Sequence, residues 1–384
     1  MKKRNKVTLI TTFIVYIIII FGGCSKPAAI SNDTNTNQEP EAVAVPAEPS
    51  NTIVEEAPRQ EEKDVGGELD EYLIEIDFGG VVMVVQGEKT ILHKAYGLAD
   101  AEHNIINTVD TPFSTCSLTK EFTGAAILML ELDGKLNTED TLDKFFNGYE
   151  GLENVSIADL LVMRGGFGNY FKYISDLIAA GDKDKINIIT AEDVEKYILE
   201  NWSGEKLGYF DYSNSDYYLL GRIIEKVSGM AYEEFVQTRL FASAGMTSSG
   251  FAGTYESAIP YKKYNGIKDV DSAILLNLPF YASYSAGGIN STAYDIGLWM
   301  DAYFGGRLFG ESILDEVEGA YNYGWRLRSK QTWWSCGALQ GFGSYNIYDR
   351  ASKTKIVILS NYNAELINSI ASKISRDVLG QQIP

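Results

Sequence analysis

A serine, a lysine and a tyrosine are spaced so that they could form a catalytic group without a histidine. Ser117 and Lys120 stand three residues apart at the start of a long apolar segment. Residues three apart on a helix share a face, so Lys120 would lie beside the Ser117 hydroxyl. Burial lowers the pKa of a lysine, and the neutral amine can then accept a proton. We therefore expect Ser117 to be a nucleophile and Lys120 its base.

The segment Tyr212-Ser213-Asn214 could complete this group. It is polar and directly precedes another apolar stretch. A phenolic oxygen can carry a proton between a serine and a leaving group if a nearby cation stabilises the phenolate. Asn214 could donate to a substrate carbonyl and hold Lys120 through its amide oxygen. The chain has 24 tyrosines, so a Tyr-x-Asn taken alone could arise by chance.

The Ser-x-x-Lys spacing occurs three times, at Ser117, Ser203 and Ser352. Ser203 stands in a loop beside glycine and tryptophan, and Ser352 stands in a charged turn. Only Ser117 precedes a predicted helix, residues 121–132, which is apolar on nearly every side and ends at a glycine. A serine cap followed by a surface lysine is the alternative, and the apolar helix leaves little surface for it.

Hydrophobic periodicity places strands near both ends of the chain and helices between them. The predicted strands are 81–85, 90–96, 332–339, 341–349 and 355–361. The predicted helices are 66–78, 121–132, 157–163, 191–201, 215–227, 232–240 and 364–379. This order predicts an α/β (α+β) fold with an antiparallel sheet built from both termini, flanked by helices, and an inserted helical lobe.

Other hydrolase and metal chemistries fit poorly. An α/β-hydrolase needs a Gly-x-Ser-x-Gly turn and a histidine after the serine, whereas His93 and His103 both precede Ser117. We expect ordinary structural roles for both histidines. No zinc-ligand spacing is present, so no metal or cofactor is expected.

The first residues are typical of an export signal. A basic start is followed by an apolar run and by small residues before Cys24. The apolar run is short for a bilayer, so a permanent membrane helix is the weaker interpretation. The cysteine after small residues resembles the lipobox of bacterial lipoproteins. We expect residues 1–23 to be a signal peptide and Cys24 to be lipidated; a plain signal peptide is the alternative.

Residues 24–66 are predicted to be a disordered acidic tether, and residues 67–384 a folded domain. The tether holds five of the nine prolines and lacks aromatic residues, so it has little apolar surface to bury. The whole chain has a net charge of −19. This charge excludes a nucleic-acid partner and disfavours electrostatic adhesion to an anionic membrane.

Two cysteines remain in the predicted domain, Cys116 and Cys336. A disulfide between them is possible in an exported protein. Small thiols buried in the core are the simpler interpretation.

Several segments together resemble the serine β-lactamase and penicillin-binding protein superfamily. The similarity is greatest to class C β-lactamases, D-alanyl-D-alanine carboxypeptidases and related esterases. The segment 111–123, which contains Ser117 and Lys120, is similar to the nucleophile segment of these enzymes. Residues 157–161 resemble the next helix, and residues 286–295 resemble a glycine loop with a helix start. The resemblance covers residues from about 79 to 361.

The resemblance implies a role for each site residue. Ser117 would be the acylated nucleophile, Lys120 its base partner, and Tyr212 the general base and proton shuttle. Asn214 would complete the second motif, and Asn214, Ser335, Gly337 and Ala338 would form the substrate-binding and oxyanion sites. The backbone amides of Ser117 and Ala338 would form the oxyanion hole, where one donor is typically worth about 3–4 kcal/mol of barrier.

The third motif departs from the family pattern. The family has lysine or histidine, then a small residue, then glycine, and here Ser335-Cys336-Gly337 stands in that place. An uncharged Ser335 would weaken the stabilisation of a phenolate and of a substrate carboxylate. Esters or amides without that carboxylate would then fit better than free peptides or β-lactams. Arg164 could replace the charge if it reached the cleft.

The sequence thus predicts an exported, lipid-anchored serine hydrolase that forms an acyl-enzyme on a peptide, ester or lactam bond. Its partners would be a small-molecule or peptide substrate, with cell-wall peptides or esters included, and a membrane through the lipid. The alternative is a catalytically weakened penicillin-interacting or cell-wall-binding lipoprotein. A purely structural lipoprotein would leave Ser117, Lys120 and Tyr212 unexplained.

Overall fold

A computed structural model describes residues 64–180, 188–264, 267–270, 280–310, 312–339, 341–362 and 364–383. The predicted signal peptide, Cys24 and nearly all of the predicted tether lie outside the described residues. Within those ranges, no helix is both long and apolar enough to cross a bilayer.

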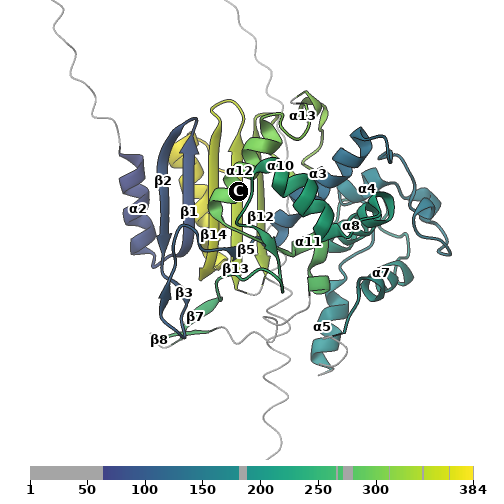
Figure 1. Ribbon diagram of the computed structural model, residues 1–384, viewed down its shortest axis with the longest axis horizontal. Coiled ribbons are helices and arrows are strands. Elements are labelled where there is room, and N and C mark those ends of the chain that lie inside the picture. Colours follow the sequence, from purple (N-terminus) through teal and green to yellow (C-terminus); the bar gives the residue numbers. More distant parts are fainter. Residues whose placement is uncertain are drawn as a thin grey trace, which may run out of the picture.

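A seven-stranded antiparallel sheet forms the centre of the fold (Figure 1). Its strand order is β10-β11-β12-β13-β14-β1-β2. The strands are β1 (Gly79–Gln86), β2 (Lys89–Tyr96), β10 (Tyr321–Asn322), β11 (Trp325–Leu327), β12 (Thr332–Leu339), β13 (Phe342–Asp349) and β14 (Thr354–Tyr362). Because β1 pairs with β14, the first and last strands lie side by side. The predicted sheet from both ends of the chain is confirmed.

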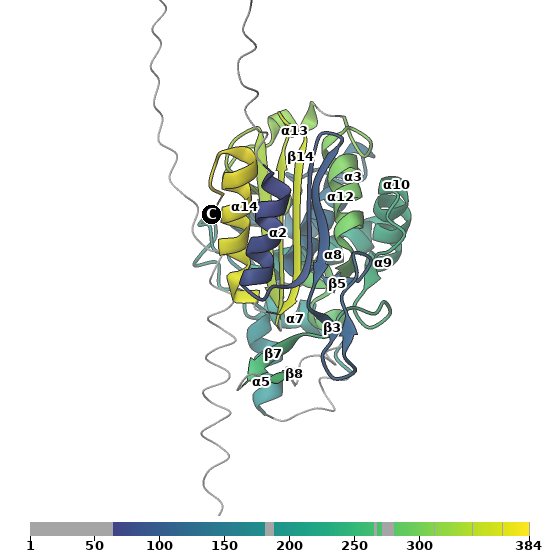
Figure 2. The same ribbon diagram turned by 90° about the vertical axis from the view of Figure 1, so that its left-hand side faces the viewer.

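Helices cover both faces of this sheet (Figure 2). One face carries α2 (Val65–Glu75) and α14 (Ile367–Leu379), whose apolar residues form one core cluster with alternate strand residues. The other face carries α3 (Thr119–Leu132) and α12 (Ala293–Phe304), which belong to a larger cluster. The period-two alternation of apolar side chains along the strands supplies both cores.

A helical lobe is inserted between the sheet strands and lies to the right in Figure 1. It contains α4 (Ile157–Leu161), α5 (Phe171–Ala179), α7 (Ala191–Glu200) and α8 (Asn214–Ser228). Ser156 caps α4, Thr190 caps α7 and Ser213 caps α8, each accepting a backbone N–H with its hydroxyl. These caps fix where each helix begins.

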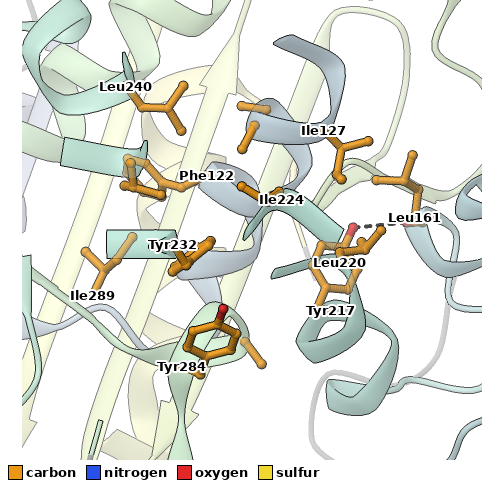
Figure 3. Packing of buried hydrophobic residues seen from close by; sticks show 14 of the residues in the cluster. Phe122, Ile127, Leu161, Tyr217, Leu220, Ile224, Tyr232, Leu240, Tyr284 and Ile289 are labelled. Atoms are coloured by element: carbon orange, nitrogen blue, oxygen red, sulfur yellow. Dashed lines mark hydrogen bonds between the residues drawn. The ribbon is translucent and has the colours of Figure 1, made fainter. Parts of the chain in front are cut away.

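Helix α3 lies in the interior, between the sheet and the lobe. All of its residues from 119 to 130 are buried. Figure 3 shows Phe122 among Tyr232, Leu240 and Ile289, and Ile127 facing Leu161 and its neighbours. Phe122 also stacks on Trp299 of α12, with ring centres 3.9 Å apart. Burial of one such side chain stabilises the fold by roughly 1.5–3 kcal/mol, so the helix that carries Lys120 is held rigidly.

A small sheet supports the segment before α3. It has the order β5-β9-β6, where β5 is Phe113–Ser114, β6 is Gly250–Phe251 and β9 is Ile289–Ser291. The short helix α11 (Tyr284–Gly287) precedes β9. Together they place the 284–291 segment directly against the start of α3.

Some elements differ from the prediction. Residues 232–240 were expected to form one helix, but α9 (Tyr232–Phe235) is followed by a π-helical turn, Val236–Phe241. Strands β10 and β11 were not predicted, because each is too short for a period-two pattern. They extend the sheet beyond β12, and β11 proves important for the site.

Candidate active site

The backbone around Ser117 is held in an unusual conformation. Cys116, just before Ser117, has φ +50°, in the left-handed region that non-glycine residues rarely adopt. Both the amide and the hydroxyl of Thr115 donate to the Ile289 carbonyl at 2.9 Å, and the Ser344 hydroxyl donates to the Thr115 carbonyl at 2.6 Å. These bonds present Ser117 half-buried on a short 3₁₀ turn, Cys116–Leu118, that leads into α3. Strained residues of this kind cluster at functional sites.

Two side chains converge on the Ser117 hydroxyl. The Lys120 Nζ lies 3.1 Å from Ser117 Oγ, and the Tyr212 hydroxyl lies 2.9 Å from the same oxygen. Lys120 is fully buried and also donates to the Ala286 carbonyl at 2.6 Å. Tyr212 reaches the site from the segment before α8, which packs on α3. The expected proximity of the alcohol, the amine and the phenol is therefore present in the structure.

Burial and charge shift the pKa values of both partners of Ser117. Burial lowers the pKa of the Lys120 ammonium, although the nearby Tyr212 oxygen opposes that effect. Burial alone would raise the pKa of the Tyr212 hydroxyl, but the Lys120 ammonium and the Arg326 guanidinium outweigh burial and lower it. The two groups titrate as one pair, because the charge of each depends on the other. Either group, in its deprotonated form, can accept the serine proton.

Strand β12 approaches the Ser117 backbone so closely that only glycine fits at position 337. A Cβ on Gly337 would lie 2.5 Å from the Ser117 amide nitrogen and 2.7 Å from Cys116 Cβ. Ala338 follows immediately and is half-buried. This approach brings the two amides that were expected to bind an oxyanion into the same region.

If Ser117 is acylated as the sequence predicts, Gly337→Ala is expected to lower the acylation rate about 100-fold, because a shift of about 1 Å between strand and serine would misplace the reacting atoms. It should also destabilise the fold by about 1–3 kcal/mol through overpacking. Gly287→Ala is the matched control, since a Cβ there would meet only ordinary contacts at 3.7–3.8 Å. Acylation rates and thermal unfolding of both variants check this, and a fully active Gly337→Ala would contradict the close approach.

Asn214 is placed differently from expectation. It is buried, and its side-chain amide donates to Asn169 Oδ1 at 3.3 Å. The expected hydrogen bond from Lys120 to Asn214 is not among those of the described residues, and the Ala286 carbonyl takes that place. Asn214 therefore contacts the 165–169 loop rather than the lysine.

Ser335 does not line the surface of the cleft. It is only 1 % exposed, and its hydroxyl donates to the Gly324 carbonyl at 3.3 Å. Its backbone amide donates to Asn346, whose side chain also donates to the buried Glu121 carboxyl. Burial raises the pKa of Glu121 well above its usual range. Ser335 is thus part of a polar connection between β12 and α3, and the expectation that it binds substrate directly is not supported by its position.

A second cation near Tyr212, besides Lys120, comes from a residue that the sequence did not reveal. Arg326 on β11 places its guanidinium carbon 5.6 Å from the centre of the Tyr212 ring. Arg164, which was considered for this role, has an exposed side chain. Only the pairing of β11 with β12 brings Arg326 to the site, and no local motif marks it.

A family model described as Beta-lactamase matches residues 70–368. The chain belongs to the Beta-lactamase family. The predicted resemblance to serine β-lactamases and penicillin-binding proteins is confirmed.

Relatives in this family include proteins with penicillin-binding names. PbpX of Bacillus subtilis (strain 168), a candidate penicillin-binding protein by its name, is 26% identical over 95% of this chain and 92% of its own length. Penicillin-binding protein 4* of the same strain is 33% identical over 45% of this chain and 38% of its own length. Protein flp of Staphylococcus aureus (strain COL) is 27% identical over 79% of this chain and 64% of its own length.

Solved structures share the fold. FmtA from Staphylococcus aureus has a TM-score of 0.71 at 22% identity and covers 83% of this chain and 89% of its own. D-amino acid amidase from Ochrobactrum anthropi SV3 has a TM-score of 0.69 at 20% identity and covers 83% of this chain and 98% of its own. Both carry the same sheet-and-helix architecture, so the predicted fold class is confirmed.

The remaining candidate residues have no hydrogen bond to the Ser117 hydroxyl among those of the described residues. His93 is in β2, and burial lowers its pKa, whereas His103 pairs with Asp100 on the surface at 2.6 Å. Ser352 binds Asp349 in the turn before β14. Cys116 is a free buried thiol, so the possible disulfide with Cys336 does not form. In the described part of the chain, no group of three or more histidine, cysteine or acidic side chains could hold a metal ion.

Asp216 holds the segment that carries Tyr212. This fully buried carboxyl accepts from the Gly165 amide at 3.1 Å, and its Oδ1 lies 2.6 Å from the Ser213 hydroxyl. It thereby joins the start of α8 to the 165–168 loop. Burial raises the pKa of Asp216 to about 7 despite these hydrogen bonds.

Asp216→Asn is expected to reduce the pH dependence of stability. The unfolded carboxyl has its ordinary pKa of 3.8, so the raised folded value favours folding at low pH, and this contribution is lost as pH rises through about 7. Wild type should therefore lose about 2 kcal/mol more of its unfolding free energy than the variant between about pH 5 and about pH 8. Urea unfolding at both pH values measures this, and equal losses would contradict the burial of an ionisable Asp216.

Proposed function

We propose that this protein is a serine hydrolase that forms an acyl-enzyme at Ser117. One observation carries the proposal: the Ser117 hydroxyl lies within hydrogen-bond distance of both a buried amine and a phenol. A hydroxyl with two such partners can lose its proton as it attacks a carbonyl carbon. A serine that served only as a helix cap would need neither partner.

In the first step Ser117 Oγ attacks the carbonyl carbon of the substrate. Its proton passes to the deprotonated form of Tyr212 or Lys120, and the lowered pKa of each group makes that form more accessible. The carbonyl oxygen becomes an oxyanion. The amides of Ser117 and Ala338 are proposed to stabilise it.

In the second step the carbonyl–leaving-group bond breaks, and Tyr212 donates the proton to the leaving group. The acyl group then remains on Ser117. Water attacks this ester with the same proton relay running in reverse, which releases an acid and restores the hydroxyl. Tyr212 is suited to this shuttle because it is half-buried and 2.9 Å from the serine oxygen.

The proposed substrates contain a peptide, ester or lactam bond, and cell-wall peptides or esters are included. The names of the relatives support this range, since they include penicillin-binding proteins and a D-amino acid amidase. Loops rather than the fold decide among such substrates. The short stretch before Tyr212 contributes exposed aromatic surface, with Tyr209 74 % and Phe210 38 % exposed.

We also propose that the enzyme is exported and anchored to a bacterial membrane through lipid on Cys24. The basic start, the apolar run and the small residues before Cys24 support this proposal. Residues 24–66 would then act as a tether that holds the domain off the membrane. Replacement of Cys24 by alanine should release the protein from membranes, and retention of the variant would argue for another anchor.

A second candidate function is a penicillin-interacting protein that acylates but turns over slowly. The uncharged Ser335, in place of the family's lysine or histidine, favours this candidate. Names such as penicillin-binding protein 4* agree with it. The two candidates share the acylation step and differ in the rate of hydrolysis.

Covalent labelling followed by turnover assays separates these candidates. The folded domain is incubated with a fluorescent penicillin and, separately, with a fluorophosphonate, and its intact mass is measured. A single adduct with turnover of a chromogenic ester or cephalosporin supports the hydrolase. An adduct without turnover supports the second candidate, and no adduct with either probe rejects both.

A further inference from the structure

Arg326 lies among aromatic rings next to the proposed proton shuttle. Its guanidinium carbon is 4.9 Å from the ring centre of Trp334, 5.4 Å from that of Tyr321 and 5.6 Å from that of Tyr212. It is 9 % exposed. A guanidinium is charged at every pH at which the protein is folded, and it stacks on aromatic faces. The site therefore contains a permanent positive charge that no sequence motif predicts.

The fold fixes this charge in place. Arg326 pairs with Trp334 in the antiparallel register of β11 and β12, so the strand pairing sets the height of the arginine along β12. Tyr321, on the neighbouring strand β10, pairs with Arg326 and lies 6.4 Å from the Tyr212 ring. The short hairpin β10–β11 thus places both Arg326 and Tyr321 next to Tyr212.

The positive charge of Arg326 could replace the cation that the third motif lacks at Ser335. A phenol acts as a base only if a nearby cation stabilises its ionised form. Lys120 cannot always supply that charge, because it exchanges protons with the same serine. Position 335 offers only a hydroxyl bound to the Gly324 carbonyl. Among the described residues, Arg326 is a further cation whose charge acts on both Lys120 and Tyr212.

We propose that Arg326 is a positioning residue whose fixed charge keeps Tyr212 competent as a base, in place of the cation that is missing at Ser335. This inference rests on the proposed function and deepens it, since it explains how the site can acylate without the third-motif lysine or histidine. The arginine acts through Tyr212 and Lys120 and needs no contact with the substrate. Substrates without a carboxylate should therefore depend on Arg326 as strongly as those with one.

Several ionisable side chains surround Tyr212 and interact with it electrostatically. They are Lys120 on α3, Arg326 on β11, Tyr321 on β10, Tyr217 on α8 and Tyr170 before α5. Burial raises the pKa of Tyr321 and Tyr170 well above the usual range, so both stay neutral when Tyr212 ionises. Within this set, Arg326 is the one guanidinium, a group that stays charged in proteins.

The test is the pH profile of acylation for wild type, Arg326→Gln and Arg326→Lys, with a neutral chromogenic ester as substrate. Loss of the charge should move the acidic limb of kcat/KM to higher pH by about one unit, about a tenfold loss at the pH of the limb. Arg326→Lys keeps a charge and should recover most of that shift. Arg328→Gln, an exposed arginine two residues along the chain, is the control for net charge and should leave the profile unchanged.

Other results would overturn the inference. A uniform fall of kcat/KM at every pH, with Arg326→Lys no better than Arg326→Gln, would mean that the arginine is only structural. A raised KM for a carboxylate-bearing penicillin alone, with the ester profile unchanged, would mean that it binds the carboxylate. Labelling at high pH checks that each variant is folded. Failure of wild type to form an adduct at any pH would instead reject the proposed function itself.

Discussion

Ser117→Ala is expected to lower kcat/KM by about 10⁴-fold or more for any ester, peptide or lactam substrate that wild type hydrolyses. The other groups cannot replace the nucleophile, because Lys120 and Tyr212 act only through its oxygen. Turnover of a chromogenic substrate by the two proteins measures this loss.

The same variant should fold normally. Ser117 is half-buried, and its neighbours on α3 are held by the core rather than by the hydroxyl. The unfolding free energy should change by no more than about 1 kcal/mol. Substantial residual turnover by folded Ser117→Ala, above that of the reagent in buffer, would place the chemistry on another residue.

Lys120→Met is expected to lower acylation by about 10³-fold or more while the fold becomes no less stable. The lysine is fully buried, and burial of its charge costs free energy, as the lowered pKa indicates. Methionine has a similar length and needs no hydrogen bond, so the loss of the bonds to Ser117 and Ala286 is offset. Stored strain of this kind is common at catalytic sites.

Lys355→Met is the matched control for this prediction. Lys355 is also mostly buried, but it lies on β14 and pairs with Asp301 at 2.6 Å. Its replacement leaves a carboxylate without a partner, so it should reduce stability and leave acylation unchanged. Thermal unfolding and acylation rates of Lys120→Met and Lys355→Met test this contrast. A large loss of stability in Lys120→Met with normal acylation would mean that Lys120 is structural rather than catalytic.

The elements of the fold with long, regular patterns could be predicted from the sequence. The strands β12, β13 and β14 have clear turns between them, and α3 is apolar on nearly every side, so their types and approximate bounds were correct. The junction after α9 was not predicted, since a π-helical turn has no period that differs clearly from that of a helix.

The site could be predicted only where its geometry is local or recurs in a known family. Ser117 and Lys120 are neighbours on one helical turn, and their contact follows from helix geometry. Tyr212 was found through its motif, although its distance from Ser117 depends on how α8 packs against α3. Arg326 was missed because its place depends on the pairing of two short strands.

Ser335, in contrast, was expected at the substrate, and its position does not support that expectation. Its place in the third motif suggested a side chain in the cleft, but the hydroxyl is buried against the Gly324 carbonyl. Gly324 has φ +89°, and a Cβ there would collide with the backbone of Lys120. The turn at residues 323–324 therefore lies directly against the start of α3, a tertiary contact that no local pattern encodes.

The central claim is that one oxygen, Ser117 Oγ, becomes covalently acylated. Peptide mapping by mass spectrometry, after incubation with a penicillin or a fluorophosphonate, tests this claim most directly. The account predicts one adduct, located on Ser117, with none on Ser203 or Ser352. An adduct on any other residue, or none on wild type under conditions where the protein is folded, would contradict it.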